Sequence, residues 1–270
     1  MYYRYGSNTA TARNREISYK RCDDEYKMDN ISDLGRVVNF LNPAYIARII
    51  SMKRIIDVAV SIVALIFLSP VLIVAAIAIK LESRGPVFFL QERIGLNRRN
   101  GDRRGRNGGH GNERRIGTDR RKNISSGKPF MIYKLRTMRE DAERYGPTLA
   151  SENDPRITRV GYLMRKTRID EIPQFLNVIK GDMSIVGPRP ERPFFINKVK
   201  QDIPEFTMRL KVKPGITGLA QVEDGYTQSI DRMKDKLVFD LKYISELSLL
   251  QEVMILFKTF YVVFSGKGAC

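Results

Sequence analysis

Residues 58–79 read VAVSIVALIFLSPVLIVAAIAI, 22 consecutive positions without one charge. As a straight helix they would measure about 33 Å, enough to span a hydrocarbon core of about 30 Å. Helices in soluble cores rarely run this long without a polar face, so the segment predicts a membrane helix. Ser69-Pro70 lies at its centre. Proline disturbs the carbonyl four residues back, here that of Ile66, and we expect the Ser69 hydroxyl to bond a freed backbone group.

Basic residues flank this segment on both sides. They are Arg48, Lys53 and Arg54 before it, and Lys80, Arg84, Arg93, Arg98 and Arg99 after it. Positive charge marks the cytoplasmic side of a membrane segment. A re-entrant helix that enters at Met52–Asp57, turns near Ser69-Pro70 and leaves at Lys80–Glu82 puts both flanks on that side. A kinked spanning helix remains an alternative, because spanning helices tolerate proline.

The overall composition limits the classes of function. The net charge of +17 over 270 residues indicates anionic partners such as phospholipid, nucleotide, sugar phosphate or nucleic acid. The two cysteines, Cys22 and Cys270, form no disulfide framework, which fits a reducing compartment. The single histidine, His110, lies in a glycine-rich stretch, which argues against histidine catalysis and a histidine metal cluster.

Residues 97–128 form a low-complexity basic block. It contains eleven Lys and Arg residues against three acids, and its large apolar residues are Ile116 and Ile124 alone. Such a composition cannot bury a core, so we expect a disordered insertion. Contact with an anionic phospholipid membrane would contribute about 1 kcal/mol per basic residue near the surface. A solvated loop is the simpler alternative, and RNA or DNA binding through this block is the alternative function.

The remaining sequence predicts an α-rich α+β protein in three parts. These are an N-terminal arm and short helix at 1–51, the membrane helix at 52–82, and a catalytic domain at 83–270 that carries the basic insertion. Within the domain we expect strands at 129–138 and 183–186, and helices at 156–168, 171–180, 192–201 and 231–246. Residues 247–264 predict a helix that lies against the bilayer surface or the core.

The densest polar cluster, Arg165–Gln174, holds adjacent carboxylates at Asp170 and Glu171 within a basic stretch. Local sequence rules favour a structural role, because aspartate is a preferred N-cap and acids suit the first helical turn. The same position suits chemistry, since helix N-termini bind phosphate and a carboxylate can attack phosphorus. The two interpretations do not exclude each other.

Two further segments suggest anion contacts. In Gly187-Pro188-Arg189-Pro190 the prolines restrict the backbone around Arg189, which would preset a phosphate contact, although a rigid turn explains them equally. The glycine-punctuated segment Lys213–Val222 could cradle a phosphate or form a simple turn.

Taken in order, several stretches resemble the bacterial sugar transferase family, the monotopic polyprenyl-phosphate phosphoglycosyl transferases of capsule, exopolysaccharide and glycan-initiation pathways. The resemblance covers the chain from about residue 52 to the C-terminus. The stretches are Lys53–Asp57, Ser69-Pro70, Gly85–Phe89, Gln91–Gly95, Tyr133–Met138, Asp154–Thr158, Arg168–Gln174, Gly187–Pro190 and Pro214–Val222.

The resemblance implies a monotopic membrane protein with a re-entrant helix broken at Ser69 and Pro70, and a cytoplasmic catalytic domain. It implies that Asp170 is the nucleophile and that Glu171 is its partner at Mg²⁺, with both carboxylates at the metal. The residues that it places at substrate phosphates are Arg165, Arg189, Lys134 and Arg136.

The expected reaction is transfer of a sugar 1-phosphate from a UDP-sugar to undecaprenyl phosphate at the cytoplasmic face of the bacterial inner membrane. UMP would leave, and a phosphosugar would be held covalently on Asp170. Two departures from the family pattern stand out: the basic block at 97–128 lengthens a link that is usually short, and Glu223–Tyr226 replaces a run such as Asn-Gly-Arg. The resemblance assigns no sugar and no oligomeric state.

Overall fold

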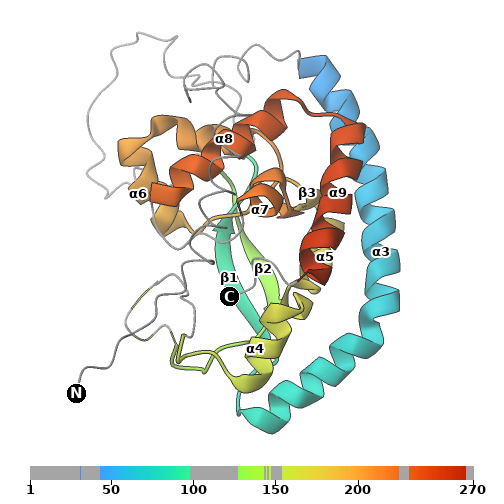
Figure 1. The fold of residues 1–270 in the computed structure, drawn as a ribbon, viewed down its shortest axis with the longest axis vertical. Coiled ribbons are helices and arrows are strands. Elements are labelled where there is room, and N and C mark those ends of the chain that lie inside the picture. Colours follow the sequence, from blue (N-terminus) through green and yellow to red (C-terminus); the bar gives the residue numbers. More distant parts are fainter. Residues whose placement is uncertain are drawn as a thin grey trace, which may run out of the picture.

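The computed structural model describes Ile31 and residues 43–97, 127–142, 144, 146, 154–224 and 231–265. A weak apolar pattern at Leu34–Leu41 is the basis for the expected short helix of the N-terminal arm; this stretch and nearly all of the basic block lie outside these residues. The described part is helix-rich with two small sheets, as an α+β class requires (Figure 1).

The apolar segment lies in one long helix, α3, which runs from Pro43 to Glu82. The helix therefore begins before the expected Met52. It stays helical through Pro70, whose nitrogen donates no hydrogen bond, so the expected break at Ser69 and Pro70 does not interrupt the helix. Figure 1 shows it descending along one side of the molecule and then bending so that its last part passes toward α4. The Ser69 hydroxyl donates to the Ile66 carbonyl at 2.8 Å, which confirms the expected compensation for the proline.

The apolar part of α3 is exposed. It is the one helix among the described residues that is long and apolar enough to cross a membrane, and only 11% of its most apolar window is buried in the protein. A core helix of a soluble protein would be covered. The exposed side chains include Ile55, Val60, Ile62, Val63, Ile66, Phe67, Ile73, Val74 and Ile77.

Both ends of α3 are attached to the same folded domain. Just before the apolar stretch 58–79, Arg54 donates to the carbonyls of Val178 and Ile179, the latter at 2.8 Å. At its end, the Glu82 carboxylate accepts from the backbone N–H groups of Arg159 at 2.7 Å and Val160 at 3.1 Å. The exposed apolar stretch therefore leaves the domain and returns to it.

Four short strands form two sheets. The strands β1 (Phe88–Ile94) and β2 (Pro129–Leu135) pair antiparallel, with Phe88 opposite Leu135 and Ile94 opposite Pro129. The strands β3 (Ser184–Val186) and β4 (Gly215–Thr217) pair parallel. The expected strands at 129–138 and 183–186 are confirmed, although β2 ends at Leu135 and Met138 forms an isolated bridge with Ile157.

Helices cover these sheets. Those over the predicted ranges lie close to their expected positions, whereas the short helices at 169–171, 204–211 and 219–223 were not predicted. Their bounds are α4 Arg159–Lys166, η2 Ile169–Glu171, α5 Gln174–Lys180, α6 Pro193–Asp202, η3 Pro204–Lys211, α7 Leu219–Glu223, α8 Asp231–Ser245 and α9 Leu249–Phe264. The expected helix at 171–180 starts later than predicted. It ends as predicted, because Gly181 adopts a left-handed conformation at φ 90° and closes α5.

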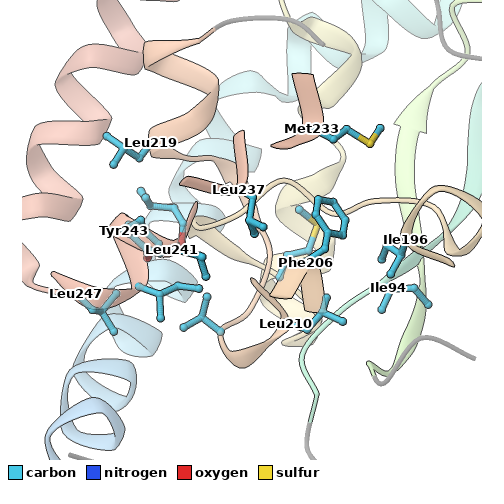
Figure 2. Close-up of a cluster of buried hydrophobic side chains, with 14 of the residues drawn as sticks. Ile94, Ile196, Phe206, Leu210, Leu219, Met233, Leu237, Leu241, Tyr243 and Leu247 are labelled. Carbon is cyan, nitrogen blue, oxygen red and sulfur yellow. Dashed lines mark hydrogen bonds between the residues drawn. The ribbon is translucent and has the colours of Figure 1, made fainter. Parts of the chain in front are cut away.

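The main core gathers side chains from β1, α6, η3 and α8 (Figure 2). The predicted apolar stripe of α8 lies in it: Met233, Leu237, Leu241 and Ile244 are all buried. Phe206 of η3 is completely buried beside them. The helical period read from the sequence is therefore confirmed at each position of the stripe.

A buried polar cluster fixes α3 just before its apolar stretch 58–79. The Lys53 ammonium donates to the Val186 carbonyl at 2.6 Å, the Tyr243 hydroxyl at 2.7 Å and the Glu252 carboxylate at 2.6 Å. One turn later, the Asp57 carboxylate accepts from the Ser184 hydroxyl at 2.6 Å. The helix α3 is thereby joined to β3, α8 and α9.

Lys53→Met is expected to lower the free energy of unfolding by about 3 kcal/mol, because it leaves the Glu252 carboxylate buried without its cation. Thermal unfolding in detergent measures the loss. Lys80→Met is the matched control, since Lys80 donates to the Gly85 carbonyl at the surface. Equal melting temperatures for the two variants would contradict the prediction.

Candidate functional site

A cavity of about 500 Å³ opens between the β1–β2 sheet, η2 and helices α7–α9. Its volume lies within the usual range of small-molecule sites. The structure brings all six predicted polar site residues to its wall: Lys134, Arg136, Arg165, Asp170, Glu171 and Arg189. They come from β2, the residue after it, α4, η2 and the turn after β3.

The two carboxylates lie on the short 3₁₀ turn η2 and are both buried. Arg168, just before them, has φ 60° and is the one non-glycine residue with positive φ among the described residues. Such a conformation costs about 1–3 kcal/mol and recurs at functional sites. It separates α4 from η2 and redirects the chain there.

The expectation that Asp170 caps the following helix is wrong. The N-cap of α5 is Pro173, which has no side-chain capping bond, and the N-cap of η2 is Arg168. Asp170 precedes the helix by a full turn of 3₁₀ structure, so its side chain is not used to satisfy the orphan N–H groups of α5. The capping alternative for this aspartate is thereby removed, although both acids lie in the first turn of η2.

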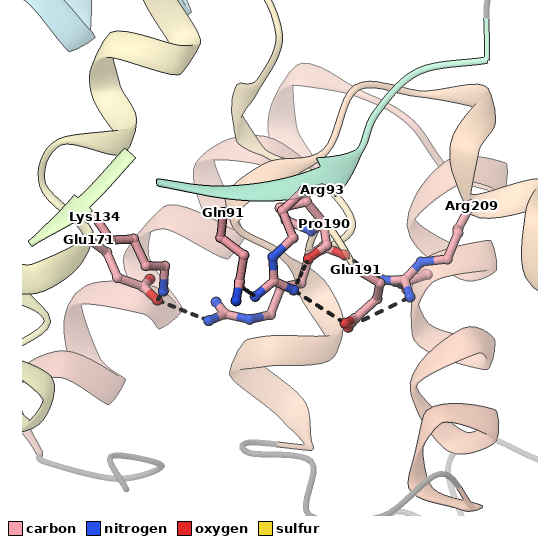
Figure 3. A network of polar contacts seen from close by, with 9 residues as sticks. Gln91, Arg93, Lys134, Glu171, Pro190, Glu191 and Arg209 are labelled. Atoms are coloured by element: carbon pink, nitrogen blue, oxygen red, sulfur yellow. Dashed lines mark hydrogen bonds and ion pairs between the residues drawn. The ribbon is translucent and has the colours of Figure 1, made fainter. Parts of the chain in front are cut away.

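Two cations meet the carboxylate of Glu171. The Lys134 ammonium lies 2.7 Å from Glu171 Oε1, and the Arg189 guanidinium donates to the same oxygen at 2.9 Å (Figure 3). The Lys134 ammonium lies 3.9 Å from Asp170 Oδ2. Glu171 is therefore the tightly paired member, and Asp170 stands at a longer distance from the shared lysine.

The surroundings move the two pKa values apart. Burial raises the pKa of Asp170 above its ordinary value, the charge of Lys134 opposes the rise, and the charge of Glu171 adds to it. Burial also acts against ionisation of Glu171, but the charges of Arg189 and Lys134 outweigh it and hold the pKa of Glu171 well below its usual range. Adjacent carboxylates tuned in opposite directions are typical of catalytic pairs.

The two remaining predicted arginines make different contacts. Arg165, in the last turn of α4, donates through Nε to the Thr137 hydroxyl at 2.9 Å. Arg136 donates to the carbonyls of Arg84 at 2.8 Å and Ser83 at 2.9 Å, so it ties the end of β2 to the loop after α3. Both line the cavity, and Arg136 donates in addition to the Ser83 hydroxyl of this loop at 2.9 Å.

Other residues of the cavity wall were not predicted. Lys236 lies on α8, where burial and then the charge of Arg189 lower its pKa to about 8. Arg93 of β1 and Glu191 also line the wall. The sequence signal for Lys236 was its place one helical turn after Met233 of the apolar stripe. For Arg93 the only signal was its place in the Gln91–Gly95 stretch that resembles the family.

The carboxylate pair suits a metal that arrives with a phosphate. Among the described residues, no group of three or more His, Cys, Asp or Glu side chains is placed to hold a metal ion. Mg²⁺ at phosphate-transfer sites commonly takes one or two carboxylates and completes its shell with phosphate oxygens and water. Asp170 and Glu171 together provide that number of carboxylates.

The glycines of the Lys213–Val222 segment allow two backbones to meet. The Gly215 N–H donates to the Pro188 carbonyl at 2.9 Å, and the Gly187 N–H donates to the Thr217 carbonyl at 2.8 Å. A Cβ atom at Gly215 would lie 2.1 Å from the Gly187 nitrogen. This segment therefore packs directly on the turn that carries Arg189. It forms β4 and the start of α7 rather than a simple turn, and its Ile216, Thr217, Gln221 and Val222 line the cavity.

Comparison with known proteins gives one family. The family model described as "Bacterial sugar transferase" matches residues 48–101 and 112–266. The unmatched residues between these ranges, 102–111, fall inside the basic block.

Curated relatives have names that agree with this family description. A UDP-N-acetylgalactosamine-undecaprenyl-phosphate N-acetylgalactosaminephosphotransferase from Aeromonas hydrophila is 39% identical over 81% of this chain and 45% of its own length. A UDP-glucose:undecaprenyl-phosphate glucose-1-phosphate transferase from Escherichia coli K12 is 37% identical over 81% of this chain and 41% of its own length. The chain thus spans less than half of these two relatives. An exopolysaccharide production protein from Rhizobium leguminosarum is 34% identical, with 80% of this chain and 98% of the relative covered.

Proposed function

The chain belongs to the bacterial sugar transferase family, and on that premise we propose that it transfers a sugar 1-phosphate from a UDP-sugar to undecaprenyl phosphate and releases UMP. The observation that carries the proposal is the buried Asp170–Glu171 pair with Lys134 and Arg189 in a cavity of about 500 Å³. The names of the relatives point to the same substrate classes and to exopolysaccharide assembly. They give no support to nucleic-acid binding.

The proposed reaction has two steps at one phosphorus atom. A carboxylate oxygen of Asp170 attacks the sugar-bearing phosphorus of the UDP-sugar, an O–P bond forms, and the bond to UMP breaks with its electron pair on UMP. A phosphate oxygen of undecaprenyl phosphate then attacks the same phosphorus. The bond to Asp170 breaks and the free carboxylate returns.

The surrounding residues hold this chemistry in place. Lys134 and Arg189 fix Glu171 beside the nucleophile and, with Arg165, provide positive charge for the phosphates of both substrates. Mg²⁺, held by the carboxylates of Asp170 and Glu171, would supply additional neutralisation of charge on the transferring phosphoryl group. Arg136 would act from the cavity wall by holding the loop after α3, through its bonds to the carbonyls of Ser83 and Arg84.

An assay of the detergent-solubilised protein against a panel of UDP-sugars tests the proposal. UMP release that requires both one UDP-sugar and undecaprenyl phosphate for sustained turnover is the expected result. Absence of UMP release with every UDP-sugar, from protein shown to be folded, would contradict the assigned reaction.

The site would lie at the cytoplasmic face of the inner membrane, with α3 as a re-entrant helix. The support is that the exposed apolar stretch begins and ends at contacts with one domain, through Arg54 and Glu82. A single domain lies on one side of a membrane, so both ends of α3 share that side. The basic flanks and the basic block would then face anionic phospholipid on the cytoplasmic leaflet.

Cysteines introduced at both ends of the apolar stretch of α3 are expected to be accessible to a labelling reagent from the cytoplasmic side only. In a chain whose two native cysteines are replaced by serine, Ser51→Cys and Arg84→Cys should react with a membrane-impermeant reagent only in inside-out vesicles. Phe67→Cys, in the exposed apolar stretch, is the control and should react from neither side. Labelling of either end in intact spheroplasts would contradict the re-entrant topology.

As the pH is lowered, kcat/KM is expected to fall at a pH above the ordinary pKa of aspartate. Asp170 must be ionised to attack, and burial raises its pKa while Lys134 opposes that rise. Lys134→Met should therefore move the acidic limb to still higher pH. Initial rates measured across the pH range provide the test, with Lys180→Met, at the exposed end of α5, as control. An acidic limb unchanged by Lys134→Met would show that Lys134 does not act on Asp170.

A further inference from the structure

The turn from Pro188 to Glu191 is held at every carbonyl. The four carbonyls accept hydrogen bonds from four donors: Gly215 N–H to Pro188 at 2.9 Å, Arg209 Nη2 to Arg189 at 2.8 Å, Arg93 Nη1 to Pro190 at 3.0 Å, and Ile94 N–H to Glu191 at 3.0 Å. The donors belong to β4, η3, β1 and again β1. Two of the four residues are prolines with fixed φ, so little backbone freedom remains in the turn.

Two of these donors are side chains with charged heads inside the protein. Arg209 is 6% exposed, and its guanidinium lies 2.8 Å from the carboxylate of Asp240, which is 2% exposed. Arg93 reaches the turn from the other side, and the carboxylate of Glu191 lies between the two guanidinium groups at 3.6 Å and 4.0 Å (Figure 3). The two successive carbonyls of Arg189 and Pro190 are therefore each fixed by a different arginine.

This arrangement is a poor way to gain stability. A buried ion pair loses hydration that its mutual attraction rarely exceeds, and apolar side chains of similar size often replace such pairs without loss. What the arrangement provides is a fixed position for the turn, because a guanidinium donates in a rigid fork that defines where its acceptor lies.

We propose that Arg93 and Arg209 are positioning residues that fix the backbone of the turn so that the Arg189 side chain reaches Glu171 and the cavity. The proposal rests on the proposed function, since it gives Arg189 a place at the reacting phosphates. Asp240 keeps Arg209 oriented from α8. Preorganised charge avoids rearrangement during the reaction, and a displacement of about 1 Å can cost about 100-fold in rate.

A double-mutant cycle separates positioning from a structural role. Arg209→Lys keeps the positive charge beside Asp240 but replaces the fork, so kcat/KM should fall by about 10- to 100-fold. In an Arg189→Ala background the same change should alter kcat/KM by less than about twofold, because the residue that it positions is absent. Arg232→Lys, at an exposed site on α8, should leave both backgrounds unchanged.

The outcomes are distinct. If Arg209→Lys costs the same factor with and without Arg189, the arginine acts on the fold in general and the positioning role is overturned. If Arg189→Ala retains full turnover, Arg189 has no part in the reaction, and both the proposed role of Arg189 and this inference fail. If Arg209→Lys does not fold, the same cycle with Arg93→Lys, which acts on the next carbonyl, decides between non-additive and additive effects.

Discussion

Asp170→Asn is expected to reduce UMP release to background, a loss of at least about 1,000-fold, while the protein remains folded. The asparagine amide has nearly the shape of the carboxylate but cannot act as its nucleophile. Stability should hold or rise slightly, because burial raises the pKa of Asp170 and so disfavours its charged form. UMP release and thermal unfolding of the same preparation measure the two effects.

The covalent step gives this prediction a second readout. Wild-type protein supplied with a UDP-sugar and no lipid acceptor should gain the mass of one phosphosugar in intact-protein mass spectrometry after a rapid quench. Asp170→Asn should gain none. Asp202→Asn, at an exposed aspartate at the end of α6, is the control and should behave as wild type in both assays. Near-normal UMP release by Asp170→Asn would refute the mechanism.

Local sequence rules predicted the features that neighbouring residues determine. The proline at position 70 and its companion serine predicted the bond from the Ser69 hydroxyl to the Ile66 carbonyl. The apolar period of α8 predicted its buried stripe, and Gly181 predicted the end of α5. In each case the cause lies within about one helical turn of the effect, where steric and hydrogen-bonding preferences are strong.

The same rules failed at Asp170 for a physical reason. An aspartate before a helix resembles a cap, and nothing in the neighbouring residues shows that the carboxylate is instead buried beside Lys134, 36 positions earlier in the sequence. Similarly, Lys53 of α3 pairs with the carboxylate of Glu252, which lies 199 positions later in the sequence. Contacts of this kind depend on how the chain packs, which single-sequence patterns do not encode.

The network behind Arg189 illustrates the same limit. The sequence singled out the Pro-Arg-Pro turn but gave no indication that Arg93 and Arg209 would bond its carbonyls. A charged residue in a helix that otherwise buries its face, such as Asp240 on α8, was the one available clue. Buried charge is costly without a partner, so such a position predicts a partner without identifying it.

Glu171→Gln is expected to lose activity by at least about 100-fold and, unlike Asp170→Asn, to lose stability as well. Gln keeps an oxygen for the Lys134 ammonium and the Arg189 guanidinium, which lie at 2.7 Å and 2.9 Å, but removes the negative charge between them. Breaking a buried pair costs about 3–5 kcal/mol. Since both cations are partly exposed, we expect about 2 kcal/mol at neutral pH after solvent screening.

The pH dependence of this loss separates the ion pair from other effects of the substitution. The cations hold the pKa of Glu171 well below its usual range, so its contribution to stability is present above the ordinary glutamate value and disappears as pH falls through the lowered value. The stability difference between wild type and Glu171→Gln should therefore be full at neutral pH and shrink in strong acid. Chemical unfolding at several pH values measures it, with the exposed Glu246→Gln as control. A difference that stays constant with pH would show that the charge of Glu171 does not stabilise the site, and that Lys134 and Arg189 are held in place by other contacts.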